Sequence, residues 1–215
     1  MLRQERVAAC PISKHEQSMS QSFNMMQAVK RRFFAMRNGA LAEQMKSAGA
    51  AYKINFGLLQ AQISDIADQV RKGTLDERPE MLEPLAMAEL ARSLRDNATT
   101  RESLLIAPML FPLELLETEE ARQWLLSCPT PEVADTLCLK LLRKHPGGAA
   151  IASEILRDPK SSDIQKYSAL RLLLNLLILR SVSPEKAKGL AAGVSGSESA
   201  MVSRLAAQIL DRCEA

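Results

Sequence analysis

Apolar residues recur every three or four positions along most of this chain, and short polar segments interrupt them. The pattern is densest in residues 82–144, where it predicts four helices with almost no connecting loop. The first begins at Pro84 and ends near Asn97. The second is expected to start at Thr99, which forms a capping-box pattern with Glu102 three residues later. Turns as short as these favour antiparallel helix pairs.

Prolines and capping residues predict where the following helices start. A third helix covers about residues 113–127. The fourth starts at Thr130 and Pro131, because a capping side chain and a proline at the first helical position both favour a helix start. It is expected to run to about Lys144. Further helices are predicted over residues 149–156 and over residues 164–179, the second capped by Ser161-Ser162-Asp163. Two more are expected from Ser183, again a cap followed by a proline, and from Ser197.

The predicted helices repeat at a regular interval. The first helices of successive pairs start near residues 80, 113, 147 and 184. Steps of about 33 to 37 residues are typical of helix-pair repeats. No segment shows a convincing alternation of apolar and polar residues with the period of a strand. The sequence therefore predicts an all-α fold, an α-solenoid of antiparallel HEAT-like helix pairs.

The N-terminal part is less regular. Residues 1–22 are expected to form a mobile leader ahead of a single repeat domain, residues 23–215. The first amphipathic helix is predicted to begin at Phe23 and to end before Asn38. The segment Tyr52-Lys53-Ile54-Asn55-Phe56-Gly57 then connects a short second helix to the third. Its two aromatic residues are predicted to anchor this connector on neighbouring helices, because loop aromatics commonly bury the ring and keep a polar tip.

Composition limits the chemistry of the chain. It has 4 cysteines without a CxxC motif and only 2 histidines, so we predict neither a metal site nor a cofactor. Scattered thiols favour a reducing, cytoplasmic location. The longest apolar run, residues 172–179, is far short of the roughly 20 residues that cross a membrane. It is predicted to be a buried core helix, and no membrane partner is expected.

Charge is unevenly distributed along the chain. Residues 1–60 hold 9 Lys and Arg against 3 Asp and Glu, and residues 136–215 hold 12 against 7. Residues 61–135 hold 7 against 15. Two basic ends thus flank an acidic middle, although the net charge is only +3. Basic surfaces attract anionic partners, so the ends are candidates for binding nucleic acid.

Several short motifs resemble the DNA alkylation repair family of HEAT-like-repeat DNA glycosylases, and specifically a shorter branch of it. The motifs are Met36-Arg37-Asn38-Gly39, Tyr52-Lys53-x-x-Phe56-Gly57, Arg101-Glu102-Ser103-Leu104-Leu105 and Glu120-Ala121-x-x-Trp124. The similarity extends over about residues 25–180. It implies the same solenoid fold and a DNA partner.

The resemblance also implies a site. In active members a carboxylate stabilises the positive charge that develops at the sugar, and a Trp lies four residues before it. Here Asp135 takes the carboxylate position, which makes it the catalytic candidate, and Pro131 takes the Trp position. Where active members carry an arginine, this chain has Lys166-Tyr167, with Arg171 one turn later. Whether the chain is an enzyme that releases alkylated bases is therefore left open.

Basic residues on the concave face hold the DNA phosphates in this family. The resemblance gives six candidates for nucleic-acid binding: Lys53, Lys140, Arg143, Lys144, Lys166 and Arg171. The helix dipole offers another explanation for several of them. It favours an acid such as Asp135 in a first helical turn and cations such as those at 140–144 in a last turn.

Two functions thus remain open from the sequence. The first is a DNA-binding protein of the alkylation-repair type, which contacts the backbone along a basic concave face. The second is a non-enzymatic scaffold that binds a peptide or a protein partner in its groove. A basic concave surface would favour DNA, whereas an apolar or acidic one would favour a protein.

Overall fold

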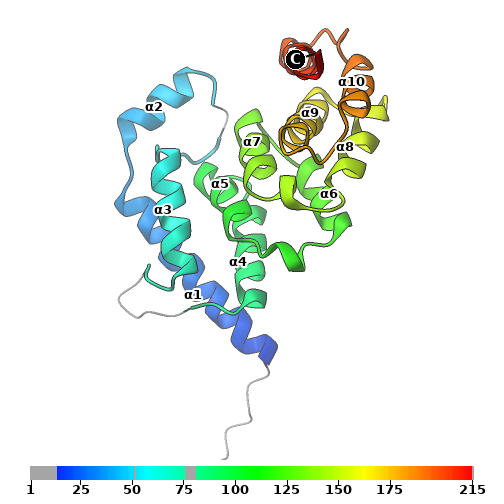
Figure 1. Ribbon diagram of the computed structural model, residues 1–215. Coiled ribbons are helices and arrows are strands. Elements are labelled where there is room, and N and C mark those ends of the chain that lie inside the picture. Colours follow the sequence, from blue (N-terminus) through cyan, green and yellow to red (C-terminus); the bar gives the residue numbers. More distant parts are fainter. Residues whose placement is uncertain (1–13, 51, 76–80, 215) are drawn as a thin grey trace, which may run out of the picture.

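The computed structural model describes residues 14–50, 52–75 and 81–214, which are all-helical (Figure 1). The helices are α1 (Lys14–Ala35), α2 (Gly39–Ser47), α3 (Gln60–Arg71), α4 (Pro84–Asp96), α5 (Arg101–Leu110), α6 (Thr118–Leu126), α7 (Pro131–Lys140), α8 (Gly148–Arg157), α9 (Asp163–Ile178), α10 (Pro184–Ala192) and α11 (Ala200–Glu214). Two short 3-10 helices, η1 (Leu113–Leu115) and η2 (Leu142–Lys144), follow α5 and α7. These ranges contain no strand, and Ile54 and Thr100 form a single isolated parallel bridge.

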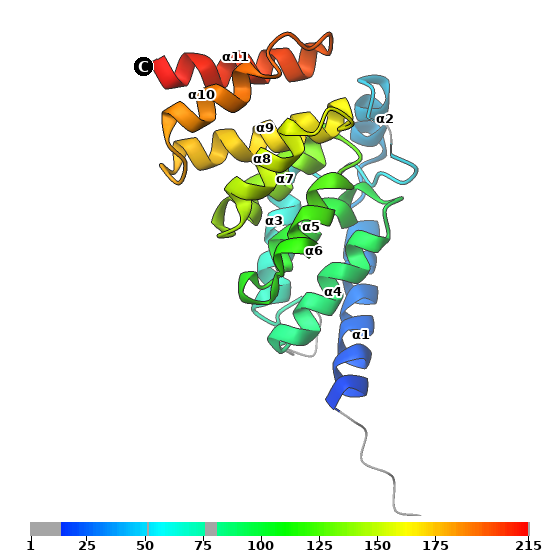
Figure 2. The same cartoon turned by 90° about the vertical axis from the view of Figure 1, so that its right-hand side faces the viewer.

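Neighbouring helices pack in a regular order. Helix α4 packs on α5, α8 on α9, and α10 on α11. The second members of these pairs also pack in succession, α5 on α7, α7 on α9 and α9 on α11, and α3 extends this row by packing on α5. Figures 1 and 2 show the chain progressing from α1–α3 through α4–α7 to α8–α11. Segments that are far apart in the sequence therefore lie in one row of helices, formed by α3, α5, α7, α9 and α11.

Several helix starts follow from local capping. The Thr130 hydroxyl accepts a hydrogen bond from the amide of Val133 at 3.4 Å, with Pro131 at the first helical position. Ser162 and Gln165 form a reciprocal capping box at the start of α9. Ser183 caps α10 by accepting from the amide of Lys186. These three helix starts confirm the sequence predictions.

The predicted start of α5 is wrong. The helix begins at Arg101, and neither Thr99 nor Thr100 caps it through its side chain. The Thr99 hydroxyl instead donates to the Asn97 side chain at 3.0 Å. Glu102 is not part of a capping box, because its carboxylate binds amides of a distant connector.

Other helix boundaries also differ from the prediction. The helix expected over residues 113–127 is divided into η1 and α6, because Leu116 is extended and α6 starts only at Thr118. Helix α1 begins at Lys14 rather than Phe23, so part of the expected leader is helical, and residues 1–13 lie outside the described residues. The helix predicted to run to Lys144 ends at Lys140, because Leu141 leaves the helical conformation with φ −122° and ψ −65°. The chain then continues as η2, which redirects the side chains of residues 142–144.

The core is aliphatic and continuous from α1 to α11. Its largest fully buried side chains include Phe33, Ile63, Leu94, Leu125 and Leu170. Most of the apolar run of residues 172–179 lies inside this core, with Leu172 and Leu173 fully buried as predicted, whereas Ile178 and Leu179 at its end are exposed. Across the described ranges, no helix combines the length and the apolar character needed to cross a membrane.

Candidate nucleic-acid interface

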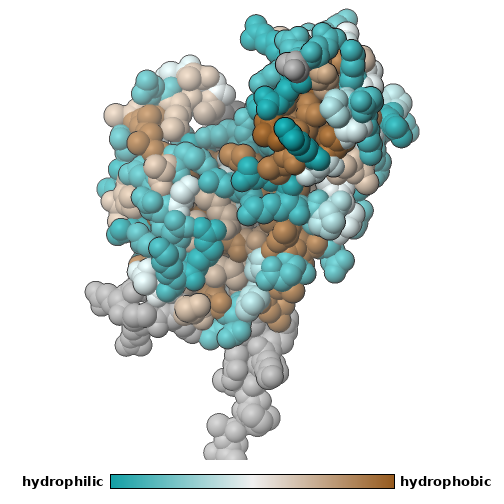
Figure 3. Space-filling view, in the orientation of Figure 1, coloured by the Kyte–Doolittle hydropathy of each residue, from teal (hydrophilic) through white to brown (hydrophobic). Residues whose placement is uncertain are grey.

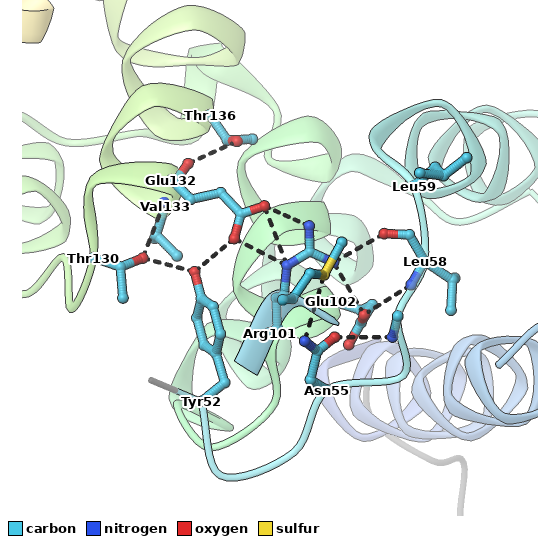
Figure 4. A network of polar contacts seen from close by, with 12 residues as sticks. Tyr52, Asn55, Leu58, Leu59, Arg101, Glu102, Thr130, Glu132, Val133 and Thr136 are labelled. Carbon is cyan, nitrogen blue, oxygen red and sulfur yellow. Dashed lines mark hydrogen bonds and ion pairs between the residues drawn. The ribbon is translucent and has the colours of Figure 1, made fainter. Parts of the chain in front are cut away.

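A partly buried polar network joins the connector before α3 to the first turns of α5 and α7 (Figure 4). We call Tyr52, Arg101, Glu102 and Glu132 the clasp. The guanidinium of Arg101 forms two hydrogen bonds from Nε to the Glu132 carboxylate, at 2.9 and 3.1 Å, and a third contact through Nη2. The Tyr52 hydroxyl donates to Glu132 Oε2 at 2.8 Å, and Thr130 lies 2.7 Å from the same hydroxyl.

The second acid of the clasp binds backbone. Glu102 is fully buried and accepts hydrogen bonds from the amides of Phe56 at 3.1 Å and Leu58 at 3.3 Å. Arg101 Nη1 donates to the Leu58 carbonyl at 2.9 Å and to Glu102 Oε1 at 3.2 Å. A buried carboxylate is costly unless its oxygens are hydrogen-bonded and its charge is paired, and both conditions are met here.

Gly57 allows the connector to pass close to the start of α2. It has a φ of +72°, and a Cβ atom there would lie 2.2 Å from the Asn38 carbonyl oxygen. The Asn38 amide donates to the Phe56 carbonyl at 2.7 Å. The Phe56 ring packs on Phe33 with centroids 6.1 Å apart. Tyr52 and Phe56 therefore anchor the connector, as predicted.

The clasp shifts the pKa of its own groups. Burial raises the pKa of Glu132, but the hydrogen bonds and charge of Arg101 and the hydrogen bond of Tyr52 outweigh burial, so the net pKa lies below its ordinary value. Burial and the neighbouring Glu132 carboxylate raise the pKa of Tyr52 well above its ordinary value. Both groups thus keep their ordinary neutral-pH states, a carboxylate and a phenol.

Asp135 lies one turn beyond Glu132 on α7 and forms a second cluster with α9. Its Oδ1 lies 2.6 Å from Arg171 Nε and accepts a hydrogen bond from the Tyr167 hydroxyl at 2.9 Å. Arg171 Nη2 donates to the same hydroxyl at 3.0 Å. The structure therefore brings together Asp135 and Arg171, which the sequence proposed separately. In this arrangement the carboxylate is already paired with a cation.

Around Asp135 there is no tryptophan face. Trp124 is 5% exposed, and its ring packs edge-on against Phe111 at 5.1 Å, with the Arg95 guanidinium 4.8 Å from its centroid. Pro131 is exposed at the start of α7. Among the described residues, Tyr167 is the aromatic residue that contacts Asp135, and its hydroxyl is used in that contact. The arrangement lacks the rings that would enclose a cationic base.

Nucleophilic cysteine chemistry is disfavoured beside this cluster. Burial raises the pKa of Cys128 to about 11 and that of Cys138 well above its ordinary value, so both stay protonated. No group of three or more His, Cys, Asp or Glu with a metal-binding arrangement is present in the part of the chain that the structure describes.

One turn after Asp135 on α7, a surface hollow of about 290 Å³ lies between α3, α5 and α7. It is lined by Ser64, Asp68, Arg71, Met109, Leu139, Lys140, Arg143 and Lys144, and we call it the basic hollow. Asp135 and Leu139 are four residues apart and share a face of α7, so the Asp135 cluster and the hollow lie about 6 Å apart along the helix. Four cations and one acid thus meet at the C-terminal ends of α3 and α7.

The charges in the basic hollow are only partly compensated. Arg71 is paired with Asp68 and donates from Nη1 to the Met109 carbonyl at 2.8 Å. Lys140, Arg143 and Lys144 have no ion pair or side-chain hydrogen bond with any residue that the structure describes. Arg143 Nε is buried without a hydrogen-bond partner. The hollow therefore holds three positive charges that no carboxylate neutralises.

The predicted binding residues do not all meet. Lys140, Arg143 and Lys144 share the basic hollow, and Arg171 belongs to the Asp135 cluster. Lys53 is exposed on the connector, and Lys166 is half-buried in the first turn of α9. The structure joins neither of these two to the other four. Arg71 was not predicted, because its only signal in the sequence is its position in the last turn of a helix.

Two adjoining hollows between α8 and α10 differ in charge from the basic hollow. Arg157 and Lys186 line both of them, Glu154 and Asp158 line the first, and Glu185 lines the second. Together the two have three acids and two cations, whereas the basic hollow has one acid and four cations. Figure 3 shows hydrophilic residues over much of the face in view, with apolar patches at the upper left, among the C-terminal helices at the upper right, and to the lower right of the centre.

Comparisons with family models, with curated proteins and with solved structures found no match for this chain. The resemblance to the DNA alkylation repair family thus stays a prediction from short motifs. Two of those motifs supply Tyr52, Arg101 and Glu102, which serve the clasp. Function must therefore be inferred from the arrangement of the surface groups.

Proposed function

We propose that this chain is a DNA-binding α-solenoid of HEAT-like helix pairs, which holds duplex DNA through its phosphates. The successive packing of α5, α7, α9 and α11 supports the solenoid, because each repeat of a solenoid contacts mainly its neighbours. The basic hollow and the Asp135 cluster lie on helices of this row. The row would provide a continuous face for the backbone of a duplex.

The observation that carries the proposal is the set of three uncompensated cations, Lys140, Arg143 and Lys144, in one hollow. Paired cations gain little from a new anionic partner, because they must first release the old one. Unpaired cations bind phosphates and release the counterions condensed on DNA, which is the main source of sequence-independent affinity. Contacts of this kind position a protein on the backbone without reading bases.

We further propose that the chain binds DNA without excising bases. Asp135 is paired with Arg171 and receives the Tyr167 hydroxyl, so its charge is already compensated. Cation–π contacts with an alkylated base need exposed ring faces, and Trp124 is buried in the core. An assay of alkylated DNA with this protein is expected to release no base above the spontaneous rate. Release that Asp135→Asn abolishes would contradict this.

Binding can be tested by fluorescence anisotropy with a labelled duplex between about 50 and 200 mM salt, the range where phosphate contacts lose affinity steeply. A triple variant, Lys140→Gln with Arg143→Gln and Lys144→Gln, is expected to reduce the salt slope by about three, because each cation that binds a phosphate adds roughly one to the slope. A matched control removes three exposed cations elsewhere, Arg157→Gln with Lys160→Gln and Lys186→Gln, and should keep the slope.

Two outcomes would overturn the proposal. No binding at the lowest salt would remove DNA as a partner. Equal losses in the two triple variants would show that only net charge matters. The first outcome would favour the second candidate function, a peptide-binding scaffold. That function is supported by three exposed apolar side chains, Leu139, Ile178 and Leu179, which are 43%, 49% and 46% exposed.

A further inference from the structure

We propose that the basic hollow selects a terminal phosphate monoester of DNA, at a nick or a broken end, over an internal phosphodiester. This rests on the proposed DNA-binding function and names the kind of DNA that the site prefers. The inference depends on how the charges converge, on the residual charge that they leave, and on the size of the hollow.

Convergence is the first step. Lys140 ends α7, and Arg143 and Lys144 lie in η2 immediately after it, so the break at Leu141 turns all three side chains toward one space. Phosphodiesters along a duplex carry one charge each and are spread along the backbone. Cations spread along a groove would match them better. Three cations around one space instead match a single group with more than one charge.

The residual charge points to the same ligand. The C-terminal ends of α3 and α7 each contribute about half a negative charge to the hollow. Arg71 and Asp68 neutralise each other. Three cations against roughly one negative charge leave about two positive charges. A phosphate monoester carries about −1.5 to −2 at neutral pH, whereas a phosphodiester carries only one negative charge.

The size and lining of the hollow fit a chain end. Its volume of about 290 Å³ lies near the lower limit of ligand sites, which commonly span about 300–1,000 Å³. That space admits one phosphate with its sugar, whereas the backbone of an intact duplex can lie only across its mouth. Arg143 lines the hollow, and its guanidinium, which has no hydrogen-bond partner among the described residues, offers a charge-assisted hydrogen bond to a phosphate oxygen. Leu139, exposed beside it, provides an apolar contact for the terminal sugar.

The test uses four labelled duplexes of one sequence: intact, nicked with a 5′-hydroxyl, nicked with a 5′-phosphate, and nicked with a 3′-phosphate. Anisotropy at about 150 mM salt should give about tenfold tighter binding to at least one phosphorylated nick than to the hydroxyl nick, because the added charge meets convergent cations. The two phosphorylated arms show which end is bound. The hydroxyl nick and the intact duplex should bind equally.

Variants separate this preference from general affinity. Arg143→Gln is expected to abolish the preference for the phosphorylated nick while intact duplex still binds. Lys186→Gln, in the mixed hollow of α8 and α10, should leave the preference unchanged. Circular dichroism of both variants checks that they fold. A preference that survives Arg143→Gln would place the phosphate elsewhere and overturn the inference.

The remaining outcomes distinguish this inference from the proposed function. Equal affinity for all four duplexes would overturn the selection of an end and leave DNA binding intact. No binding to any duplex would overturn both. An unlabelled phosphoserine peptide is added as a competitor. Displacement by this peptide at lower concentration than by a phosphorylated oligonucleotide would reassign the hollow to a phosphoprotein and overturn the DNA assignment.

Discussion

The clasp and the basic hollow lie at opposite ends of the same helix, α7, and use the same kinds of side chain. Glu132 at the start of α7 accepts hydrogen bonds from a buried arginine and a tyrosine, which together occupy its oxygens, and Thr130 contacts the tyrosine hydroxyl (Figure 4). Lys140 at the end of α7 meets other cations and no free acid. The comparison shows that charged residues of one type differ in whether partners already compensate their charge, and this difference is the basis for proposing a binding role for the hollow alone.

Burial explains the difference. Arg101 is 3% exposed and Glu102 is fully buried, so each would lose its hydration without compensation if it had no partner. Such groups persist in a fold only as closed networks. Lys140 and Lys144 of the hollow are exposed and keep contact with water, which stabilises them without a carboxylate. They can therefore exchange water for a phosphate at little cost to the fold.

The strongest test of this contrast is Glu102→Ala. It leaves Arg101 without part of its compensation and leaves the amides of Phe56 and Leu58 unpaired in the core. We expect the free energy of unfolding to fall by about 3–5 kcal/mol, the usual cost of breaking a buried pair from one side. Urea denaturation measures it.

Glu119→Ala is the control for this variant. Glu119 makes an exposed pair with Arg122, so its loss should change stability by less than about 1 kcal/mol. Similar losses of stability in the two variants would show that the clasp is no stronger than a surface pair.

The second test is Gly57→Ala, which acts on the connector rather than on the charges. A methyl group at this position would lie 2.2 Å from the backbone oxygen of Asn38, and the φ of +72° is unfavourable for alanine. The combination should cost at least about 2 kcal/mol. Thermal unfolding measures this loss of stability. Gly189→Ala is the control, because Gly189 lies in α10 and a Cβ atom added there would have nothing within 4 Å. That control should be neutral or stabilising by up to about 1 kcal/mol.

Local sequence patterns predicted the elements of the fold well. The spacing of apolar residues located the helices, and Thr130, Ser162 and Ser183 located three starts, because caps act within four residues. Glu102 was misassigned for the opposite reason. A glutamate three residues after a threonine has the capping-box pattern, but its partners here are amides 44 and 46 residues away. Nothing in the local pattern could reveal them.

The candidate site was predictable in part. The cations at 140–144 are close in sequence, so their clustering was expected, whereas their convergence depends on the break at Leu141. The pairing of Asp135 with Arg171 depends on the register of α7 against α9. Arg71 enters the hollow from α3, about 70 residues before Lys140. Positions set by helix packing were therefore beyond the reach of spacing and composition.

A third, smaller effect concerns pH. The pKa of Glu132 is lower in the folded protein than its ordinary value of 4.5. At a given pH in this range, the Glu132 side chain therefore binds fewer protons in the folded protein than in the unfolded chain. Its contribution to stability is fully present above pH 4.5 and is lost as the pH falls through the folded pKa. Urea denaturation from about pH 7 to about pH 3 should show this decline, and Glu132→Gln should reduce it. An identical decline in this variant would assign the pH dependence to other carboxylates.

The smallest expected effect is on the hollow itself. The triple variant Lys140→Gln, Arg143→Gln and Lys144→Gln removes charges that have no carboxylate partner, so the fold loses no ion pair. The change also relieves mutual repulsion but weakens the compensation of the helix dipole, two small effects of opposite sign. Each of the three substitutions should change the free energy of unfolding by no more than about 0.5 kcal/mol relative to the parent protein. By contrast, Arg101→Gln replaces one buried cation of the clasp and should cost several times more. A triple variant as unstable as Arg101→Gln would mean that the hollow is a second clasp, and its cations would then be structural rather than available to DNA.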